Sequence, residues 1–459
     1  MPDTTADVVI CGAGIAGISA AYHLAVKHGV RDVLLVDERP PLSLTSDKST
    51  ECYRNWFPGP GDALVSLMNR SIDILEDVAH ATGNVINMNR RGYLFATADP
   101  ARIEDFRQAA EEAASLGAGP MRVHAGQPGD SPYAPAPAHG FEGQPTGADL
   151  ILDQKLIREH FNYLPEETVA VVHPRRCGWF SAQQLGMYML ERARERGVRL
   201  LPARMEAVHV AGGQVQAVRL QSQEGARTIT THRLVIAAGP LINQAVKMIG
   251  VEAPVHCEFH AKIAFPDHLG IVSRDAPLVI WTDSQHLPWT ESERSELSGS
   301  DDRWLLDQFP SGVHMRPEGP ADSPIILALW TYHTEPVEPV LPPVYDPYYP
   351  DIVMRGLMTM IPRLKAYIGR IPKLVVDGGY YAKTQENRPL VGPLPVQGAF
   401  LIGALSGYGL MSSPALGELL AAHVTGSALP PYSPAFLLER YKDPEYQELL
   451  KNWGATGQL

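Results

Sequence analysis

Cysteine is scarce in this sequence, and the few cysteines show no metal-binding or disulfide pattern. The 459 residues include four cysteines, Cys11, Cys52, Cys177 and Cys257, and no two of them form a CxxC pair. Cysteine pairs at short spacing are typical of zinc sites, and dense even sets are typical of disulfide frameworks. The sequence therefore predicts no metal site and favours a reducing compartment.

Long apolar runs are missing too. No stretch reaches the roughly 20 apolar residues that a membrane-spanning helix needs. Residues 1–7 lack the charged, apolar and cleavage regions of a secretory signal. We predict a cytoplasmic protein with no membrane span.

An excess of positive charge is also lacking. The formal net charge is −12, which gives no electrostatic reason to bind nucleic acid or an anionic membrane, although a local basic patch would not register in a whole-chain count. We exclude nucleic acid as the main partner. The 45% hydrophobic and 20% charged content is typical of a soluble globular protein, and the length predicts two or three domains.

The most informative motif present is a GxGxxG turn formed by Gly12, Gly14 and Gly17, which follows one apolar run, while Asp37 ends a second one. Gly12 permits a tight strand-to-helix turn, Gly14 lets the backbone approach a pyrophosphate, and Gly17 lets the helix pack on the strand. Asp37 stands at about the offset of an acid that binds a ribose. We predict a dinucleotide site, with a purely structural glycine turn as the alternative.

Small residues and polar loops recur later in the chain where a ligand would lie. A polar loop spans residues 45–50, a buried strand runs into residues 237–239, and a glycine turn at 407–411 precedes a helix at 414–424. Strand patterns at 262–265, 278–281 and 325–329 predict the sheet of a second domain. The sequence thus predicts an α/β fold: a doubly wound, Rossmann-like domain built from both chain ends, and an α+β domain with a mixed or antiparallel sheet.

Residues 117–147 are dense in glycine, proline and alanine and show little periodicity. This composition predicts a long surface loop or insertion. It is either a lid or a passive insertion.

Three separated pieces, residues 12–37, residues 237–239, and residues 388–393 with 407–411, together resemble the FAD-dependent D-amino-acid oxidase superfamily. Within it, the chain is most similar to the branch of glycine oxidase, sarcosine oxidase and dimethylglycine dehydrogenase. The resemblance runs in order along nearly the whole chain and is weakest at 117–147 and 266–318. It implies FAD as the cofactor.

The resemblance also implies where FAD would lie. Adenosine would contact Asp37 and Glu38, the pyrophosphate would lie on Ile15 and Ala16, and the isoalloxazine would lie between the 45–50 loop and the 407–411 turn. The candidate cofactor-binding residues are Gly12, Gly14, Ile15, Ala16, Gly17, Asp37, Glu38, Arg39, Thr45, Ser46, Lys48, Ser49, Thr50, Ala238, Gly239, Pro389, Gly407, Tyr408, Gly409, Leu410 and Met411.

Domain boundaries and the mode of FAD attachment follow from the same resemblance. Covalently linked relatives carry a cysteine a few residues before the 388–389 pair, whereas residues 378–381 here are Gly-Gly-Tyr-Tyr. We therefore predict non-covalent FAD.

The predicted FAD-binding domain comprises 1–95, 150–250 and 375–430, the substrate-binding domain comprises 96–149 and 251–374, and 431–459 form a carboxyl-terminal tail.

Arg54 follows the polar loop, where members of the branch place basic residues near the flavin. A guanidinium binds a carboxylate through two parallel hydrogen bonds, so Arg54 is a candidate carboxylate clamp, with a structural or surface ion pair as the alternative. Met411 replaces a basic residue that often supplies a second carboxylate contact, and Tyr408 replaces a usual histidine. These departures suggest a larger or less charged substrate.

The candidate catalytic residues are Arg54, His260, Lys262, Tyr332 and Tyr408. Lys262 is a candidate for promoting oxygen reduction, as a buried lysine does in some family oxidases. Tyr332, with its neighbours Trp330 and His333, is a candidate for lining the substrate face. The alternative for each is a structural or exposed position, because an isolated histidine or lysine is a poor functional predictor.

The sequence thus predicts an FAD-dependent oxidase or dehydrogenase that removes hydride from a carbon next to an amine nitrogen, giving an imine that water hydrolyses. Its partners would be an amine or amino acid substrate and either dioxygen or an electron carrier. Alternatives are oxidation of a hydroxy acid or alcohol, with His260 or His333 as base, a catalytically silent flavoprotein subunit, and, from the first motif alone, an NAD(P)-dependent dehydrogenase.

Overall fold

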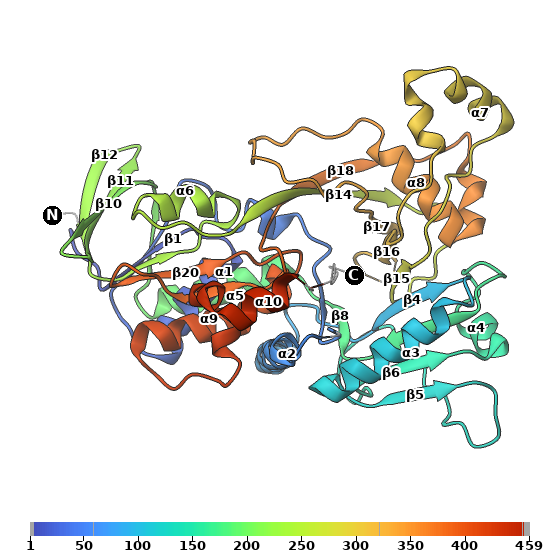
Figure 1. Cartoon of the computed structure of the whole chain (residues 1–459), viewed down its shortest axis with the longest axis horizontal. Helices are drawn as coiled ribbons and strands as arrows, with labels where there is room; N and C mark the ends of the chain where they lie inside the picture. The colour runs from blue at the N-terminus through green and yellow to red at the C-terminus, as the bar shows by residue number, and fades with distance from the viewer. Residues whose placement is uncertain (1–3, 58, 321, 452, 454–459) are drawn as a thin grey trace.

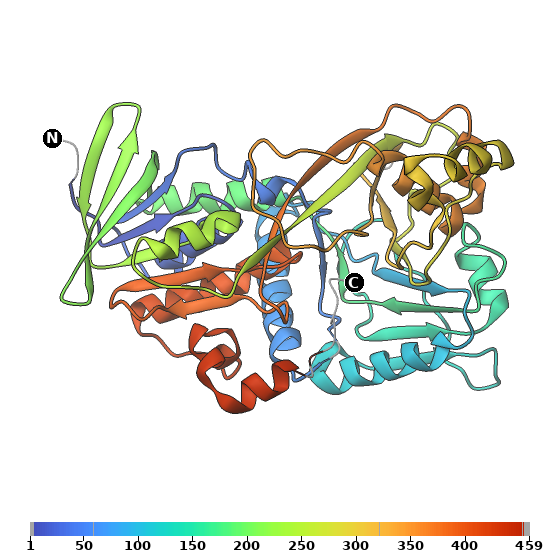
Figure 2. The ribbon, with the colours of Figure 1, turned by 45° about the horizontal axis from the view of Figure 1, so that its top comes forward.

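The computed structural model describes residues 4–57, 59–320, 322–451 and 453 and contains two large sheets (Figures 1 and 2). The first sheet has six strands in the order β19 (Leu390–Pro393), β20 (Ala399–Gly403), β13 (Leu234–Ile236), β1 (Val8–Cys11), β2 (Val33–Asp37) and β9 (Arg199–Pro202). All neighbours are parallel except β19, which pairs antiparallel with β20. This sheet therefore joins strands from both ends of the chain, which confirms the predicted doubly wound fold.

Each face of the six-stranded sheet has its own covering layer. Val8 and Ile10 face a core shared with α1 (Ile15–Tyr22), α5 (Ala182–Glu195) and α9 (Gly409–Thr425), whereas Val9 faces a core shared with a small sheet. Side chains alternate across a strand, so an unbroken apolar run supplies both faces. The small sheet is formed by β10 (Arg204–Ala211), β11 (Gln214–Ser222) and β12 (Gly225–Thr230).

The second large sheet is mixed and has nine strands. Their order is β18 (Val375–Lys383), β14 (His256–Pro266), β17 (Ile325–Leu329), β16 (His314–Pro317), β15 (Leu278–Trp281), β4 (Tyr93–Thr97), β7 (Ala170–Pro174), β6 (Ala148–Ile151) and β5 (Met121–His124). The predicted strands at 262–265, 278–281 and 325–329 lie within β14, β15 and β17.

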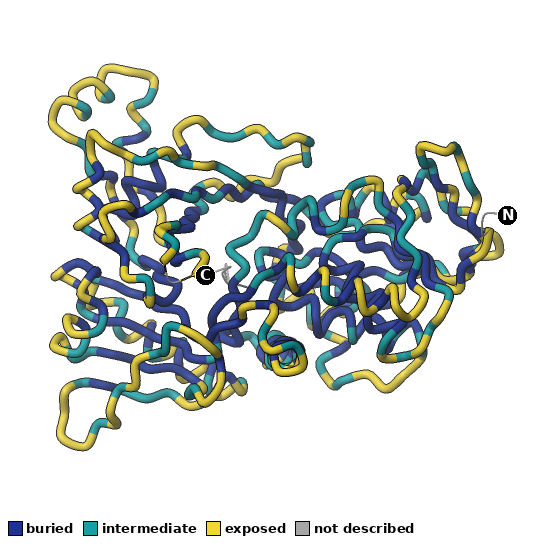
Figure 3. The backbone as a smooth tube through the Cα atoms, turned by 180° about the vertical axis from the view of Figure 1, so that it is seen from behind, coloured by how far each residue is buried: buried dark blue, intermediate teal, exposed yellow. Residues whose placement is uncertain are grey.

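The remaining elements are short or cover these sheets. They are β3 (Cys52–Arg54), which pairs with β8 (Cys177–Trp179), and the helices α2 (Ala63–Thr82), α3 (Arg102–Ala113), α4 (Gln154–His160), α6 (Ile242–Lys247), α7 (Glu291–Ser298), α8 (Tyr349–Met360) and α10 (Pro444–Lys451). Figure 2 shows α2 standing between the two large sheets. In Figure 3 the interior of the molecule is mostly buried and many outer loops are exposed, and α7 contains no buried residue. Among the described residues, no helix combines the length and apolar character of a membrane span.

Sheet membership differs from the predicted domain division at several strands. The predicted FAD-binding segments include all of β7 and β18 and parts of β4 and β6, but these strands pair within the nine-stranded sheet. Their apolar runs do not tell which sheet they join, because pairing partners are set by tertiary packing. Residues 452 and 454–459 of the predicted tail lie outside the described residues.

The segment 117–147 contains a strand that its composition concealed. β5 pairs parallel with β6 at the sheet edge, and His124 is buried against Asp149 with its Nε2 3.0 Å from Oδ1. This segment does not line any of the cavities described below that reach the glycine turn. The structure therefore does not support a lid role for residues 117–147 over that site.

Helices α1 and α9 pack through a contact that leaves no space for an extra methyl group. A Cβ on Gly417 of α9 would lie 2.2 Å from Ser19 Oγ of α1, and Ser19 Oγ donates a hydrogen bond of 2.8 Å to Ser413 O. We predict that Gly417→Ala destabilises the protein by about 1–3 kcal/mol through overpacking. The apparent melting temperature should fall by several degrees.

A matched control is Gly299→Ala, because a Cβ there would lie 3.9 Å from Glu296 O, which is an ordinary contact distance. Its melting temperature should stay at or slightly above that of the wild type. Equal melting temperatures for the Gly417→Ala and Gly299→Ala variants would contradict the packing described for α1 and α9.

Candidate active site

The glycine turn lies at the carboxyl ends of the parallel strands β1, β2 and β13, where open α/β sheets bind their ligands. Gly12 has a φ of +113°, and a Cβ on it would lie 2.2 Å from Ala237 O. A Cβ on Gly17 would lie 1.9 Å from Gly12 O. Both positions therefore require glycine, which brings the start of α1 to the edge of the sheet.

Polar groups at this edge fit a dinucleotide. The Asp37 carboxylate accepts hydrogen bonds from the backbone N–H groups of Ala13, at 2.8 Å, and Arg39, at 2.9 Å. Ser46 Oγ accepts the N–H of Ile15 at 3.0 Å, at the first residue of α1. The start of a helix favours an anion because its N–H groups lack carbonyl partners within the helix.

Four cavities follow one another from this edge to the second sheet. The nucleotide-end cavity, lined by Gly12, Asp37 and Ala238, and the linking cavity, lined by Ala16 and Ala382, both reach Gly14 and Ser46. The linking cavity meets an inner cavity at Ser49, Tyr381, Gly407 and Leu410. The inner cavity meets an outer cavity at Arg54 and Tyr408. The four cavities therefore form a course from the glycine turn to Arg54 in which each cavity shares wall residues with the next.

Most of the predicted cofactor-binding residues line this course. Gly17, Lys48 and Pro389 do not line any of the four cavities. Gly17 packs against Gly12, and Lys48 Nζ forms ion pairs with Asp47 at 3.0 Å and Asp377 at 3.2 Å. Pro389 O accepts a hydrogen bond from Arg440. These three residues support the site from behind its walls.

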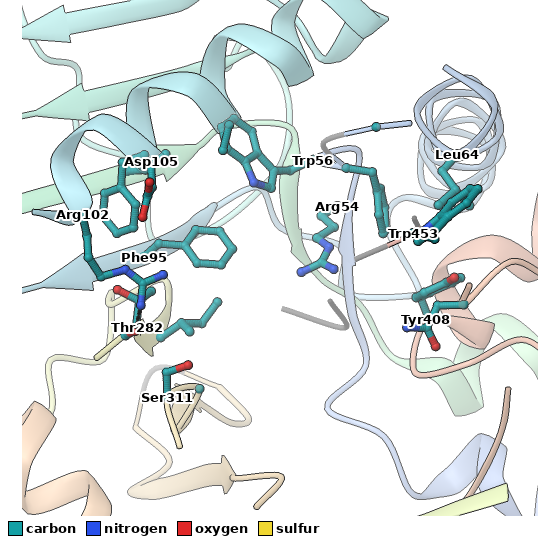
Figure 4. Close-up of a pocket in the computed structure, with 18 of the residues that line it drawn as sticks. Arg54, Trp56, Leu64, Phe95, Arg102, Asp105, Thr282, Ser311, Tyr408 and Trp453 are labelled. Carbon is teal, nitrogen blue, oxygen red and sulfur yellow. Dashed lines mark hydrogen bonds between the residues drawn. The ribbon is translucent and has the colours of Figure 1, made fainter. Parts of the chain in front are cut away.

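Arg54 and Tyr408 lie where the inner and outer cavities meet. Arg54 is buried at the end of β3, with its guanidinium carbon 4.6 Å from the Phe57 ring centroid, and burial lowers its pKa. The Tyr408 ring packs edge-on against Phe57 at 5.5 Å, and burial raises the pKa of its hydroxyl. Figure 4 shows Arg54 between Phe95 on one side and Tyr408 on the other. A buried cation in an aromatic wall is suited to an anionic or π-rich ligand.

His260 and Lys262 point to the same face of β14 but have different surroundings. His260 is buried, lines the inner cavity, and stacks on the Tyr381 ring at 4.2 Å. Lys262 Nζ donates to the carbonyls of Asp47, at 3.3 Å, and Ser49, at 2.9 Å, and does not line the four cavities. Its place behind the polar loop makes it a support for that loop.

Tyr332 lies away from the cavities, and its neighbour Thr331 is the residue that faces them. Leu329 and Thr331 line the inner cavity, whereas Trp330 and Tyr332 pack in the core of the second sheet, and Tyr332 Oη donates to Asp346 at 3.1 Å. Alternation along an extended segment explains the one-residue difference. His333 is exposed.

Sequence reasoning also missed several aromatic and polar residues of the site. Tyr381 and His314 line the inner cavity, and Trp56, Phe57 and Phe95 line the outer cavity. Tyr381 belongs to the segment 378–381, whose lack of cysteine bears on FAD attachment but does not show that one of its tyrosines faces a cavity. The others carried no distinguishing pattern.

Residues 7–423 match the family model described as FAD dependent oxidoreductase. The chain belongs to this family. It is therefore an oxidoreductase, and FAD is the cofactor that the family implies. The glycine-crowded turn, the free end of α1 and the carboxylate of Asp37 fit such a cofactor.

Named relatives support the same fold. Mitochondrial dimethylglycine dehydrogenase from Mus musculus is 23% identical over 428 residues, which cover 91% of this chain but 42% of the relative. The chain thus spans less than half of that protein. L-proline dehydrogenase from P. horikoshii has a TM-score of 0.71 at 18% identity, with 96% of this chain and 99% of that chain covered. Glycine oxidase from Geobacillus kaustophilus has a TM-score of 0.70 at 15% identity, with 95% and 99% covered.

Asp37 provides a direct test of the nucleotide end. We predict that Asp37→Ala weakens FAD binding at least tenfold, because the variant loses the acceptor for ribose hydroxyls and the carboxylate that orders the Ala13 and Arg39 backbone. Titration of the apoprotein with FAD, followed by flavin fluorescence, measures the change. Glu252→Ala, at an exposed carboxylate that does not line the four cavities, is the control and should bind as the wild type does.

Proposed function

We propose that this protein oxidises the C–N bond of an amine or amino acid, in particular a secondary or tertiary amine or an N-methylated amino acid. When bound, FAD supplies the acceptor for the hydride, and its electrons then pass to dioxygen or a carrier. The observation that carries the proposal is the series of adjoining cavities from the glycine turn to the buried Arg54. A small molecule held at Arg54 would lie beside the inner cavity.

In this proposal Arg54 binds the substrate carboxylate. Its guanidinium is buried beside Phe57 and Tyr93, with the guanidinium carbon 4.6 Å and 5.8 Å from the two ring centroids. Stacking on aromatic faces holds a guanidinium in place, and the planar guanidinium fork matches the geometry of a carboxylate. The Tyr408 hydroxyl, in the same wall, is kept in its neutral form by burial, so it can donate a hydrogen bond.

The outer cavity favours a substrate with an apolar group. Trp56, Phe57 and Phe95 supply aromatic surface, and Met411 lines the inner cavity where a second basic residue would otherwise stand. One carboxylate contact plus an apolar chamber fits an N-alkylated amino acid better than a small dicarboxylate. Dimethylglycine dehydrogenase and L-proline dehydrogenase, named above, are named for amino acids with a tertiary and a secondary amine.

The test is a substrate screen on the purified flavoprotein under anaerobic conditions. We expect secondary and tertiary amino acids to bleach the flavin absorbance, and readmission of oxygen to restore it rapidly in an oxidase but slowly in a dehydrogenase. Bleaching by hydroxy acids alone would favour the rival reaction, for which His260 in the inner cavity offers a base. No bleaching by amines, amino acids or hydroxy acids would contradict both enzyme functions.

Arg54 gives the matching mutational prediction. We expect Arg54→Ala to raise the KM for a carboxylate-bearing substrate roughly 10- to 100-fold, because charged hydrogen bonds contribute about 1.5–3 kcal/mol. The KM for an amine without a carboxylate should change little. Arg192→Ala, at a surface arginine paired with Glu195, controls for the loss of an arginine. Equal effects of Arg54→Ala on both substrate types would contradict the carboxylate contact.

A further inference from the structure

The wall of the inner cavity contains a hydroxyl, an imidazole and a carboxylate in series. Thr331 Oγ1 lies 2.9 Å from His260 Nδ1, and His260 Nε2 lies 3.0 Å from Glu258 Oε2. Thr331 and His260 line the cavity, while Glu258 is buried behind them. Such a series is a known means of moving a proton through hydrogen-bonded groups.

Protonation states fix the direction of these hydrogen bonds. Burial lowers the pKa of His260, against the opposing effect of Glu258, so the imidazole is neutral near pH 7. Burial acts to raise the pKa of Glu258, but hydrogen bonds from His260 and Lys383 lower this pKa to about 2. Glu258 is therefore an acceptor, and His260 Nε2 must carry the imidazole proton. Nδ1 then accepts the Thr331 hydroxyl proton, which leaves the lone pairs of Thr331 Oγ1 for the cavity.

Charged groups around His260 set how readily it takes up a proton. Lys383 Nζ of β18 donates to both carboxylate oxygens of Glu258 at 2.9 Å, and His256 Nε2 lies 3.5 Å from Glu258 Oε1. Arg54 and His314 line the same cavity, and burial lowers the pKa of His314 to about 4. Lys383 disfavours an imidazolium, whereas Glu258 favours it. Burial and Lys383 together outweigh Glu258, so the imidazole is neutral at rest, and the Glu258 carboxylate is placed to stabilise an imidazolium when one forms.

We propose that Thr331, His260 and Glu258 form a relay that removes the ammonium proton of the bound substrate. The proposal rests on the proposed amine oxidation, because hydride can leave the carbon only when the adjacent nitrogen has a free lone pair. The substrate N–H bond breaks as Thr331 Oγ1 takes the proton, and the Thr331 hydroxyl proton passes to His260 Nδ1. The products are a neutral amine and an imidazolium stabilised by Glu258, and no electrons are exchanged.

A purely structural role for this series would tie β14, β17 and β18 together without affecting proton transfer. The two roles differ in the pH dependence of anaerobic flavin bleaching at saturating amine substrate. In the wild type the rate constant should rise with pH only until His260 is neutral, and then remain level. In Thr331→Val it should be about 100-fold lower at pH 7, because positioned acid–base groups contribute roughly 10²–10⁴-fold.

The bleaching rate constant of Thr331→Val should rise towards the wild-type value as the pH approaches the pKa of the substrate amine, about 10, because solvent then removes the proton. Thr331→Ser keeps a hydroxyl and should restore the wild-type profile. Thr168→Val is the matched control: Thr168 is buried, and its hydroxyl has no hydrogen-bond partner in the described structure. It should leave the profile unchanged.

A second measurement does not depend on turnover. Nitrogen-15 NMR of labelled histidine, with the His260 signal assigned from a His260→Gln variant, should report an Nε2-protonated neutral ring at pH 7. Thr331→Val should shift the Nδ1 resonance, because its hydrogen-bond donor is removed. If Thr331→Val fails to fold, His260→Gln provides the kinetic comparison and is expected to show the same slow, pH-dependent bleaching.

The possible results distinguish a failure of the proposed relay from a failure of the proposed amine oxidation. If amines reduce the flavin of the wild type, and Thr331→Val or His260→Gln shows the same pH profile as the wild type, only the relay is overturned. A wild type that no amine reduces would overturn both the relay and the proposed function. A neutral ring protonated on Nδ1 would also overturn the relay, because Thr331 could not then donate to it.

Discussion

The backbones of Gly12 and Gly17 lie so close to each other and to Ala237 that no side-chain atom fits between them. This close approach fixes α1 against β1 and β13, and the first N–H groups of α1 then face the edge of the sheet where a dinucleotide is bound. The linking and inner cavities continue from this point. The nucleotide end of the proposed site therefore depends on where this contact places the helix.

The two large sheets contribute different chemistry to one course of cavities. The six-stranded sheet supplies backbone N–H groups, small residues and Asp37, which suit phosphate and ribose. Strands β14 and β18, with the segment that follows β17, supply His260, Tyr381 and Thr331 from the nine-stranded sheet. Arg54 enters on a two-stranded ribbon between them. The reactive part of the site is thus assembled between sheets, whereas the nucleotide end belongs to one.

The sequence was sufficient to predict what depends on local backbone geometry. The glycine turn, Asp37 and the 407–411 turn could be predicted because a short segment carries the whole signal, and all their residues except Gly17 line the course of cavities. On the segment 330–333 the sequence pointed to Trp330, Tyr332 and His333, whereas Thr331 lines the inner cavity. Alternation along an extended segment divides the side chains between two faces, but it does not show which face meets a cavity. Residue type alone also does not show where a side chain points: Lys262 donates to the carbonyl of Ser49 in the polar loop, and Tyr332 donates to Asp346. Sheet membership of β4, β6, β7 and β18 likewise depended on partners far along the chain.

The wide separation of the strands in the six-stranded sheet bears on how the protein is made. β1 begins at Val8, and its sheet lacks β20 until Ala399–Gly403 have been synthesised. At about 5–20 residues per second, the ribosome takes roughly 20–80 s to cover that distance. During this interval the amino-terminal strands expose apolar faces that their final neighbours cannot yet cover. The edge of the sheet that would hold the nucleotide is therefore complete only after β20 has been synthesised.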